Sequence, residues 1–193
     1  MKNPFRSHNK LVAGFGGVAI VALLAAVPGT AVAAPTLTST VLSPSHAKAL
    51  GFTKTVQAAK KTKVTSQKGC TVSVEAVYED AASKTGLVSE SLQCASKAAA
   101  VKALAGARKQ VKVDTSIKAP KKLGPAAFAT STDAPEYLMA WINGSRVAIT
   151  ALDVDVAASS STSTSSTVAP TPLTPAQIRT LTAAALKQNS LYG

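Results

Sequence analysis

The sequence is poor in the residues that most often carry chemistry. Two cysteines, two histidines and one tryptophan occur among its 193 residues, and aromatic residues make up 4% of the chain. His46 is the only histidine beyond residue 33, so a zinc site would lack ligands and a Ser-His-Asp arrangement is only formally possible. The hydrolase motif Gly-x-Ser-x-Gly is absent. We therefore expect no catalytic residues, no metal and no cofactor, and we interpret His46 as a surface or helix-capping residue.

Acidic residues are scarce as well, which leaves the chain strongly basic. Nine Asp and Glu stand against 21 Lys and Arg, and the formal net charge is +12. Lysines concentrate at residues 48–68 and 97–122, and such a surface attracts polyanions with a strength that falls as salt rises. These segments lack interleaved aromatic residues, so we expect no nucleic-acid partner. The expected partners are anionic cell-wall polymers or an unknown small ligand, although lysines also simply keep a surface solvated.

Two acidic pairs, Glu79-Asp80 and Asp153 with Asp155, could hold calcium loosely. Neither pair has the glycine and the oxygen-ligand spacing of a dedicated calcium loop. We interpret Glu79-Asp80 as the start of a turn.

One long hydrophobic run occurs, near the start of the chain. Residues 11–27 follow three basic residues, and Ala31-Val32-Ala33 supplies the small residues of a signal-peptidase site. The run is too short and too rich in glycine for a good membrane span, and no cysteine follows it to accept a lipid. We predict that residues 1–33 are a Sec-type signal peptide cleaved near Ala33-Ala34. The product is then secreted, with neither a lipid anchor nor a membrane span.

The two cysteines fit a disulfide across a hairpin. Apolar and polar residues alternate from Cys70 onwards and again before Cys94, which is typical of half-buried strands. A hairpin formed by these strands places Cys70 opposite Cys94 and Val72 opposite Leu92. An even cysteine count in an exported chain supports the same pairing, so we predict a structural Cys70–Cys94 disulfide.

A second hairpin is predicted around Asn143-Gly144, a typical type I′ turn. Pairing across this turn aligns Leu138 with Ile149 on one face. The other face carries the candidate binding surface, which comprises Tyr137, Met139, Trp141 and Arg146. A cation–π contact between Trp141 and Arg146 is expected there. The alternative is that these residues lie under a helix as ordinary core.

Three helices are predicted from caps and apolar spacing, at residues 44–50, 97–110 and 174–190. In the second helix, Val101, Leu104 and Ala105 are expected to form the apolar stripe. A short strand is predicted at 126–130, and the Ser/Thr/Pro-rich residues 157–173 read as a flexible loop, with glycosylation left open.

These elements predict an α+β fold, with a mainly antiparallel sheet of two hairpins plus a short strand and with helices packed on one side. Three segments follow: the signal peptide at 1–33, an N-terminal basic segment with a short helix at 34–68, and a single domain at 69–193. We expect a monomer.

Several short motifs resemble the secreted sensor-like domains of actinobacteria, which occur as lipoproteins and as extracellular modules of Ser/Thr kinases. They are Gly69-Cys70-Thr71-Val72-Ser73-Val74 with the later Cys94, then Leu123-Gly124-Pro125-Ala126-Ala127-Phe128, the Asn143-Gly144 turn, and Leu173-Thr174-Pro175-Ala176-Gln177. The chain departs from the family at Pro125 and Ala126, where an acidic pair is usual. The resemblance implies a ligand-sensing or binding domain without catalysis, and it carries over no site residue.

The resulting functional expectation is a non-enzymatic binding or sensing domain at the bacterial cell envelope. The alternative is a cell-wall-associated structural protein held by its lysine-rich segments. A secreted protease inhibitor is a third possibility, but no reactive-loop signature supports it.

Overall fold

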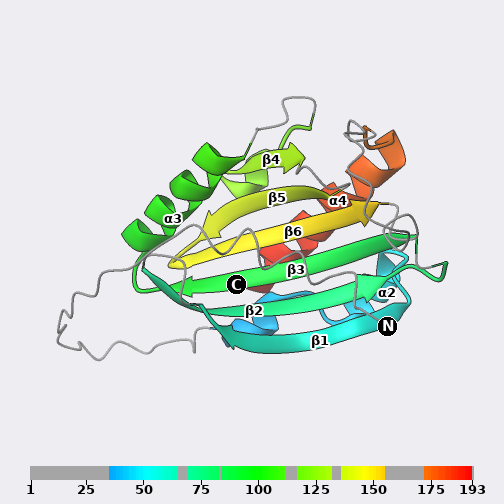
Figure 1. Cartoon of the computed structure of the whole chain (residues 1–193), viewed down its shortest axis with the longest axis horizontal. Helices are drawn as coiled ribbons and strands as arrows, with labels where there is room; N and C mark the ends of the chain where they lie inside the picture. Colours follow the sequence, from blue (N-terminus) through cyan, green and yellow to red (C-terminus); the bar gives the residue numbers. More distant parts are fainter. Residues whose placement is uncertain are drawn as a thin grey trace, which may run out of the picture.

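A six-stranded antiparallel sheet forms the centre of the molecule, with strand order β1-β2-β3-β6-β5-β4 (Figure 1). The computed structural model describes residues 35–64, 69–82, 84–111, 117–131, 136–154 and 172–192. The strands are β1 (Lys54–Lys63), β2 (Cys70–Glu79), β3 (Thr85–Cys94), β4 (Phe128–Ser131), β5 (Glu136–Asn143) and β6 (Arg146–Val154). The helices are α2 (Pro44–Ala49), α3 (Lys97–Gln110) and α4 (Pro175–Asn189), with short 3₁₀ turns η2 (Leu37–Thr40), η3 (Lys121–Leu123) and η5 (Ser190–Tyr192). The predicted α+β class is confirmed.

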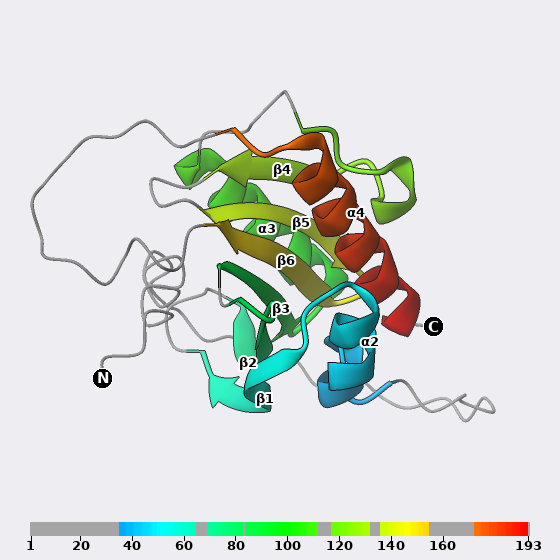
Figure 2. The ribbon, with the colours of Figure 1, turned by 90° about the vertical axis from the view of Figure 1, so that its right-hand side faces the viewer.

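Helices cover both faces of the sheet, so the prediction that they pack on one side is wrong. Helix α3 packs on one face, whereas α2 and α4 both lie on the other (Figure 2). The reason lies in the alternation along the strands, because successive side chains point to opposite faces. Met139 and its neighbour Leu138 are both buried, one in each core layer. A sheet that is apolar on both faces needs cover on both.

Strand β1 was not predicted from the sequence, and it makes the N-terminal basic segment part of the sheet. It pairs antiparallel with β2, with two register shifts along its length. Almost all of its residues are exposed, so it carries no apolar alternation that would mark a strand. The residues before it also belong to the core, since Leu42, Ala47 and Phe52 are buried against the α4 side of the sheet.

The pairing of β2 with β3 agrees with the predicted hairpin only at its end. Cys70 lies opposite Cys94 as predicted, but Val72 lies opposite Gln93 and Leu92 opposite Ser73. An irregularity between Cys70 and Val72 inserts the extra residue, and a one-residue slip changes which face a side chain occupies.

The β5–β6 hairpin turns one residue later than predicted. Asn143 lies opposite Arg146, so Gly144-Ser145 forms the two-residue connection, with Gly144 at φ 59°. Leu138 consequently lies opposite Ala151 rather than Ile149. The shift moves each partner by two positions, so every side chain keeps its predicted face.

Capping explains why the helix starts were predictable. The Thr174 side chain accepts a hydrogen bond from the backbone N–H of Gln177, and the Gln177 side chain accepts one in return, which is a capping box. Ser96 caps α3, and its oxygen lies 3.1 Å from the backbone nitrogen of Ala99. Ser43 caps α2 together with His46, which confirms the interpretation of His46 as a capping residue.

Two predicted segments lie outside the described residues: the signal peptide at 1–33, and nearly all of the Ser/Thr/Pro-rich loop at 157–173. Within the part of the chain that is described, no helix has the length and apolar character needed to cross a bilayer.

Candidate binding pocket

The predicted disulfide joins Cys70 to Cys94 and fixes the start of α3. The two sulfurs are 1.99 Å apart, and both cysteines are buried on the α3 face. Just beyond the bridge, the backbone N–H of Ala95 donates to the carbonyl oxygen of Gly69 at 2.8 Å. A Cβ on Gly69 would lie 3.1 Å from the Cβ of Ala99 in the first turn of α3. This contact is tight, and the backbone of Gly69 has φ 88°, a conformation that favours glycine.

The predicted contact surface is not a surface, because its three large side chains are core residues. Tyr137, Met139 and Trp141 are at most 2% exposed, and they lie on the sheet face that α4 covers. The indole nitrogen of Trp141 donates to Asn189 Oδ1 on α4 at 2.9 Å. Trp141 therefore helps to hold α4 on the sheet.

Arg146 does not make the predicted contact with Trp141, and it contacts other residues instead. Its Nε donates to Gln93 Oε1 at 2.9 Å, and its Nη2 donates to the carbonyl oxygen of Pro35 at 2.7 Å. The guanidinium carbon lies 5.9 Å from the ring centre of Tyr192, a distance typical of a cation–π contact. Because the turn is shifted, the residue opposite Trp141 on β6 is Ala148 and not Arg146. The role of Arg146 visible here is to join both ends of the described chain to the sheet.

Buried polar groups on the same face are paired with one another. Thr150 Oγ1 donates to Gln188 Oε1 at 2.6 Å, and Gln188 Nε2 donates to the backbone oxygen of Glu90 at 2.8 Å. Tyr192 hydrogen-bonds through its hydroxyl to Ser91, and burial raises the pKa of Tyr192. Tyr78 donates to the carbonyl oxygen of Leu42, and burial raises the pKa of Tyr78 to about 12. These buried polar groups therefore have hydrogen-bond partners within the protein.

His46 is held in a setting that favours its neutral form. Burial lowers the pKa of His46, and the charge of the nearby Lys187 lowers it further. Nδ1 of His46 accepts from the backbone N–H of Ser43 at 3.4 Å, which requires that nitrogen to be unprotonated. Its role is structural.

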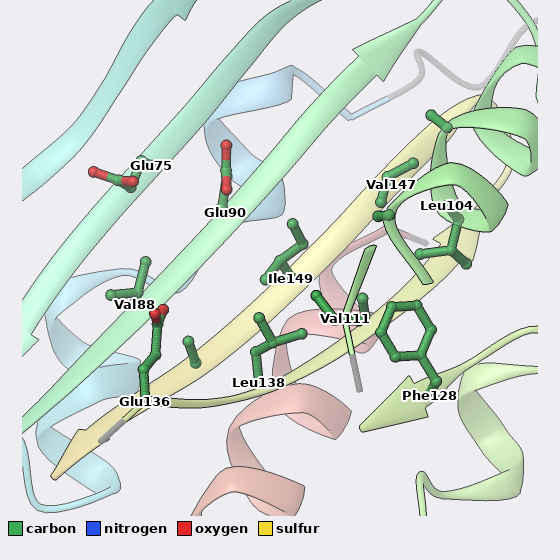
Figure 3. Close-up of a pocket in the computed structure, with 14 residues that line it drawn as sticks. Glu75, Val88, Glu90, Leu104, Val111, Phe128, Glu136, Leu138, Val147 and Ile149 are labelled. Atoms are coloured by element: carbon green, nitrogen blue, oxygen red, sulfur yellow. The ribbon is translucent and has the colours of Figure 1, made fainter. Parts of the chain in front are cut away.

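The opposite face of the sheet contains a pocket beneath α3. Its walls come from α3 and from strands β2 to β6 (Figure 3). The volume of about 50 Å³ is several times the roughly 10–15 Å³ that one water molecule needs. The lining residues are Glu75, Val88, Glu90, Ala103, Leu104, Ala107, Val111, Phe128, Glu136, Leu138, Ala140, Val147, Ile149 and Ala151.

Helix α3 presents small residues to the sheet, which leaves space for this pocket. Ala100, Ala103 and Leu104 are its buried residues, and Ala107 continues the same stripe at helical spacing. Val101, which the sequence analysis placed on the apolar stripe, is 46% exposed. Alanine side chains fill little of the gap between helix and sheet, so the pocket opens where the stripe continues past Leu104.

Among the described residues that line the pocket, the ionisable ones are three glutamates. Glu75 on β2 and Glu90 on β3 are cross-strand partners, and Glu90 is in turn the partner of Ile149 on β6. Gln57 on β1 donates to Glu75 Oε1 at 3.0 Å. Glu136 begins β5 and is 9% exposed, whereas Glu75 and Glu90 are half-buried. Two of the three acidic side chains, Glu75 and Glu90, are therefore neighbours in a mainly apolar pocket, and Glu136 lies further along the sheet.

The far wall of the pocket is aromatic and aliphatic. Phe128 is 4% exposed, and the Arg108 guanidinium lies over its ring at 5.8 Å from the centre. Figure 3 shows Glu75 and Glu90 on one side of the pocket and Leu104 and Phe128 on the other. The pocket thus has a carboxylate end and an apolar end.

Of the two acidic pairs considered from sequence, only Glu79-Asp80 lies wholly within the described residues. Asp80 Oδ1 accepts from the backbone N–H of Lys84 at 2.9 Å, which agrees with the predicted start of a turn at Glu79-Asp80. Asp153 lies in β6, and Asp155 is outside the described residues. Among the residues that are described, no three His, Cys, Asp or Glu side chains gather so as to hold a metal ion.

The sequence analysis missed this pocket, although one signal for it was present. Alternate residues of β3 share one face of the sheet, and on this face Val88, Leu92 and Cys94 are apolar whereas Glu90 is charged. A charged residue on the apolar face of a core strand is unexpected, and it indicates a place where the layer that covers this face is incomplete.

Comparison of the chain with protein-family models, with curated proteins and with solved structures found no match. The resemblance to sensor-like domains, drawn from short motifs, therefore stays a prediction.

Proposed function

We propose that the chain is an exported, non-enzymatic binding or sensing domain at the bacterial cell envelope, and that its ligand occupies the pocket beneath α3. The observation that carries the proposal is the pocket itself, which combines apolar walls with three glutamates in its lining. Binding sites for small molecules are commonly concave, mainly apolar and equipped with a few placed polar groups. The proposed contact surface thus moves from the Trp141 face to the opposite face of the sheet.

The pocket is built on rigid parts, as a binding site requires. Most of its lining residues lie on strands in the middle of the sheet, and the disulfide anchors the helix above them. Sites supported by strands and helices hold their geometry better than sites on loops. The export part of the proposal is supported by the pattern of residues 1–33 and by the disulfide, which is typical of oxidising compartments.

A pocket-filling variant tests this proposal. Ala107 is half-buried on α3 and lines the pocket, so Ala107→Phe places a ring inside it. Ala105→Phe adds the same ring to the same helix at an exposed position that is not part of the lining. We expect thermal unfolding of the oxidised protein to shift upward with a ligand from a panel of small amphiphiles, peptidoglycan fragments and metabolites. Ala107→Phe should remove the shift and Ala105→Phe should keep it.

A ligand shift that survives Ala107→Phe unchanged would place binding elsewhere and contradict the proposal. Equal melting temperatures of the two unliganded variants would show that lost binding does not reflect lost folding.

A second candidate function is electrostatic retention on anionic cell-wall polymers. The exposed edge strand β1 favours it, because Lys54, Lys60, Lys61 and Lys63 lie along this single strand and are exposed. Lysines on an edge strand also discourage pairing with other sheets, which gives them a purely structural use. The salt dependence of the protein's retention on cell walls distinguishes wall attachment from protection of the edge strand.

A further inference from the structure

We propose that the pocket beneath α3 selects a cationic amphiphile, a small molecule with an apolar body and one protonated amine. This inference rests on the proposed function and specifies the chemistry of its ligand. It is argued from the sign of the charges in the pocket, from their arrangement and from the surrounding charge of the protein.

The charge in the pocket opposes that of the whole protein. Only nine of the 193 residues are acidic and the net charge is +12, yet the three ionisable residues of the lining are all glutamates. Among the described residues, two nearby cations lie outside the lining: Lys60 is the cross-strand partner of Glu75 on its β1 side, and Arg108 lies over the Phe128 ring. An anionic ligand would meet like charges inside the pocket, which reduces its affinity.

Glu75 and Glu90 place two like charges opposite each other in the sheet. Like charges directly opposite each other destabilise an antiparallel pair. An ammonium group placed near both carboxylates would offset this repulsion. Each carboxylate offers about four lone-pair positions, so a ligand N–H can be accepted in addition to existing partners such as Gln57.

The arrangement of the lining gives the ligand a direction. The carboxylates of Glu75 and Glu90 mark the end of the pocket toward β2 and β3, and Leu104 and Phe128 mark the apolar end (Figure 3). An amphiphile fits with its amine toward the carboxylates and its body under α3. A bare metal ion does not suit the site, because these carboxylates are spread over separate strands and, among the described residues, do not gather as a metal-binding group.

Three probes of equal length test the inference: hexylamine, hexan-1-ol and hexanoate. Each is titrated into the oxidised protein purified after export, near pH 7 and at moderate salt, and binding is followed by amide NMR shifts. We expect hexylamine to bind about tenfold more tightly than hexan-1-ol, and hexanoate to bind most weakly. The largest shifts should come from residues of the pocket lining.

Isosteric variants assign the preference to the pocket carboxylates. Glu90→Gln and Glu136→Gln each remove one charge from the lining, and both should reduce the preference for the amine over the alcohol. Glu79→Gln removes the same charge from β2 at a position outside the lining, and it should leave the preference unchanged. Because Glu136 is more deeply buried, the half-buried Glu90 provides the variant with the lower risk to folding.

The outcomes separate this inference from the proposed function. Equal binding of amine and alcohol, both abolished by Ala107→Phe, would overturn the charge selectivity and leave the pocket as a binding site. An equal loss of preference in Glu79→Gln and Glu90→Gln would also overturn it, since distant charge would then suffice. If no probe binds, or if Ala107→Phe has no effect on binding, both the inference and the proposed site fail.

Discussion

At the scale of single residues, Trp141 shows how burial changes what a substitution means. It is fully buried and bonded to Asn189, so its removal leaves a large cavity under α4. Trp141→Ala should lower the free energy of unfolding by about 3–5 kcal/mol, measured by urea denaturation followed by circular dichroism. Trp141→Phe keeps much of the volume and should cost less. A loss below about 1 kcal/mol in the alanine variant would contradict the buried position.

The sequence pattern predicted which side chains share a face of the sheet better than it predicted whether that face is exposed to solvent. The alternation along β5 correctly placed Tyr137, Met139 and Trp141 together on one face. It could not tell whether that face meets solvent or a helix, because α4 comes from residues far along the chain. The pocket was missed for the same reason, since it depends on how much space α3 leaves above Glu90.

At the scale of elements, the disulfide is the anchor of the hairpin and of α3. Its two cysteines are separated by 24 positions, and closing a loop of this length stabilises a fold by roughly 3–4 kcal/mol in the chain-entropy model. The double variant Cys70→Ser, Cys94→Ser should lose about this much stability in urea denaturation. The parent protein treated with reductant should behave like the variant. A variant as stable as the oxidised parent would contradict this role.

Helices were more predictable than strand pairing. Residues 97–110 were predicted as helical and α3 has these bounds, because Ser96 provides a local cap that can be read from sequence. Registers depend on irregularities such as the one between Cys70 and Val72, which leave no clear mark in composition. Strand β1 was missed because its exposed, lysine-rich residues show no periodicity, and only its pairing with β2 makes it a strand.

At the scale of the whole molecule, the exposed lysines of β1 allow a test of cell-wall retention. The protein should remain on washed cell walls at low salt and be released by about 300 mM salt, where the Debye length falls to about 6 Å. The triple variant Lys60→Gln, Lys61→Gln, Lys63→Gln should be released at lower salt. The matched variant Lys97→Gln, Lys102→Gln, Lys109→Gln removes the same number of charges from α3. It should need a higher salt concentration for release than the β1 variant. Retention that ignores salt would contradict an electrostatic attachment.

The link that Arg146 makes between Pro35 and Tyr192 bears on when the molecule can fold. Both contacts join distant parts of the chain, and α4 completes the layer over Trp141. A chain that crosses a membrane from its N-terminus delivers Pro35 before the strands of the sheet and α4 after them. Until then the Trp141 face stays uncovered, and such surfaces promote association between incomplete chains. Under the export proposed above, completion of the native state therefore has to wait until α4 has crossed the membrane and reached the sheet.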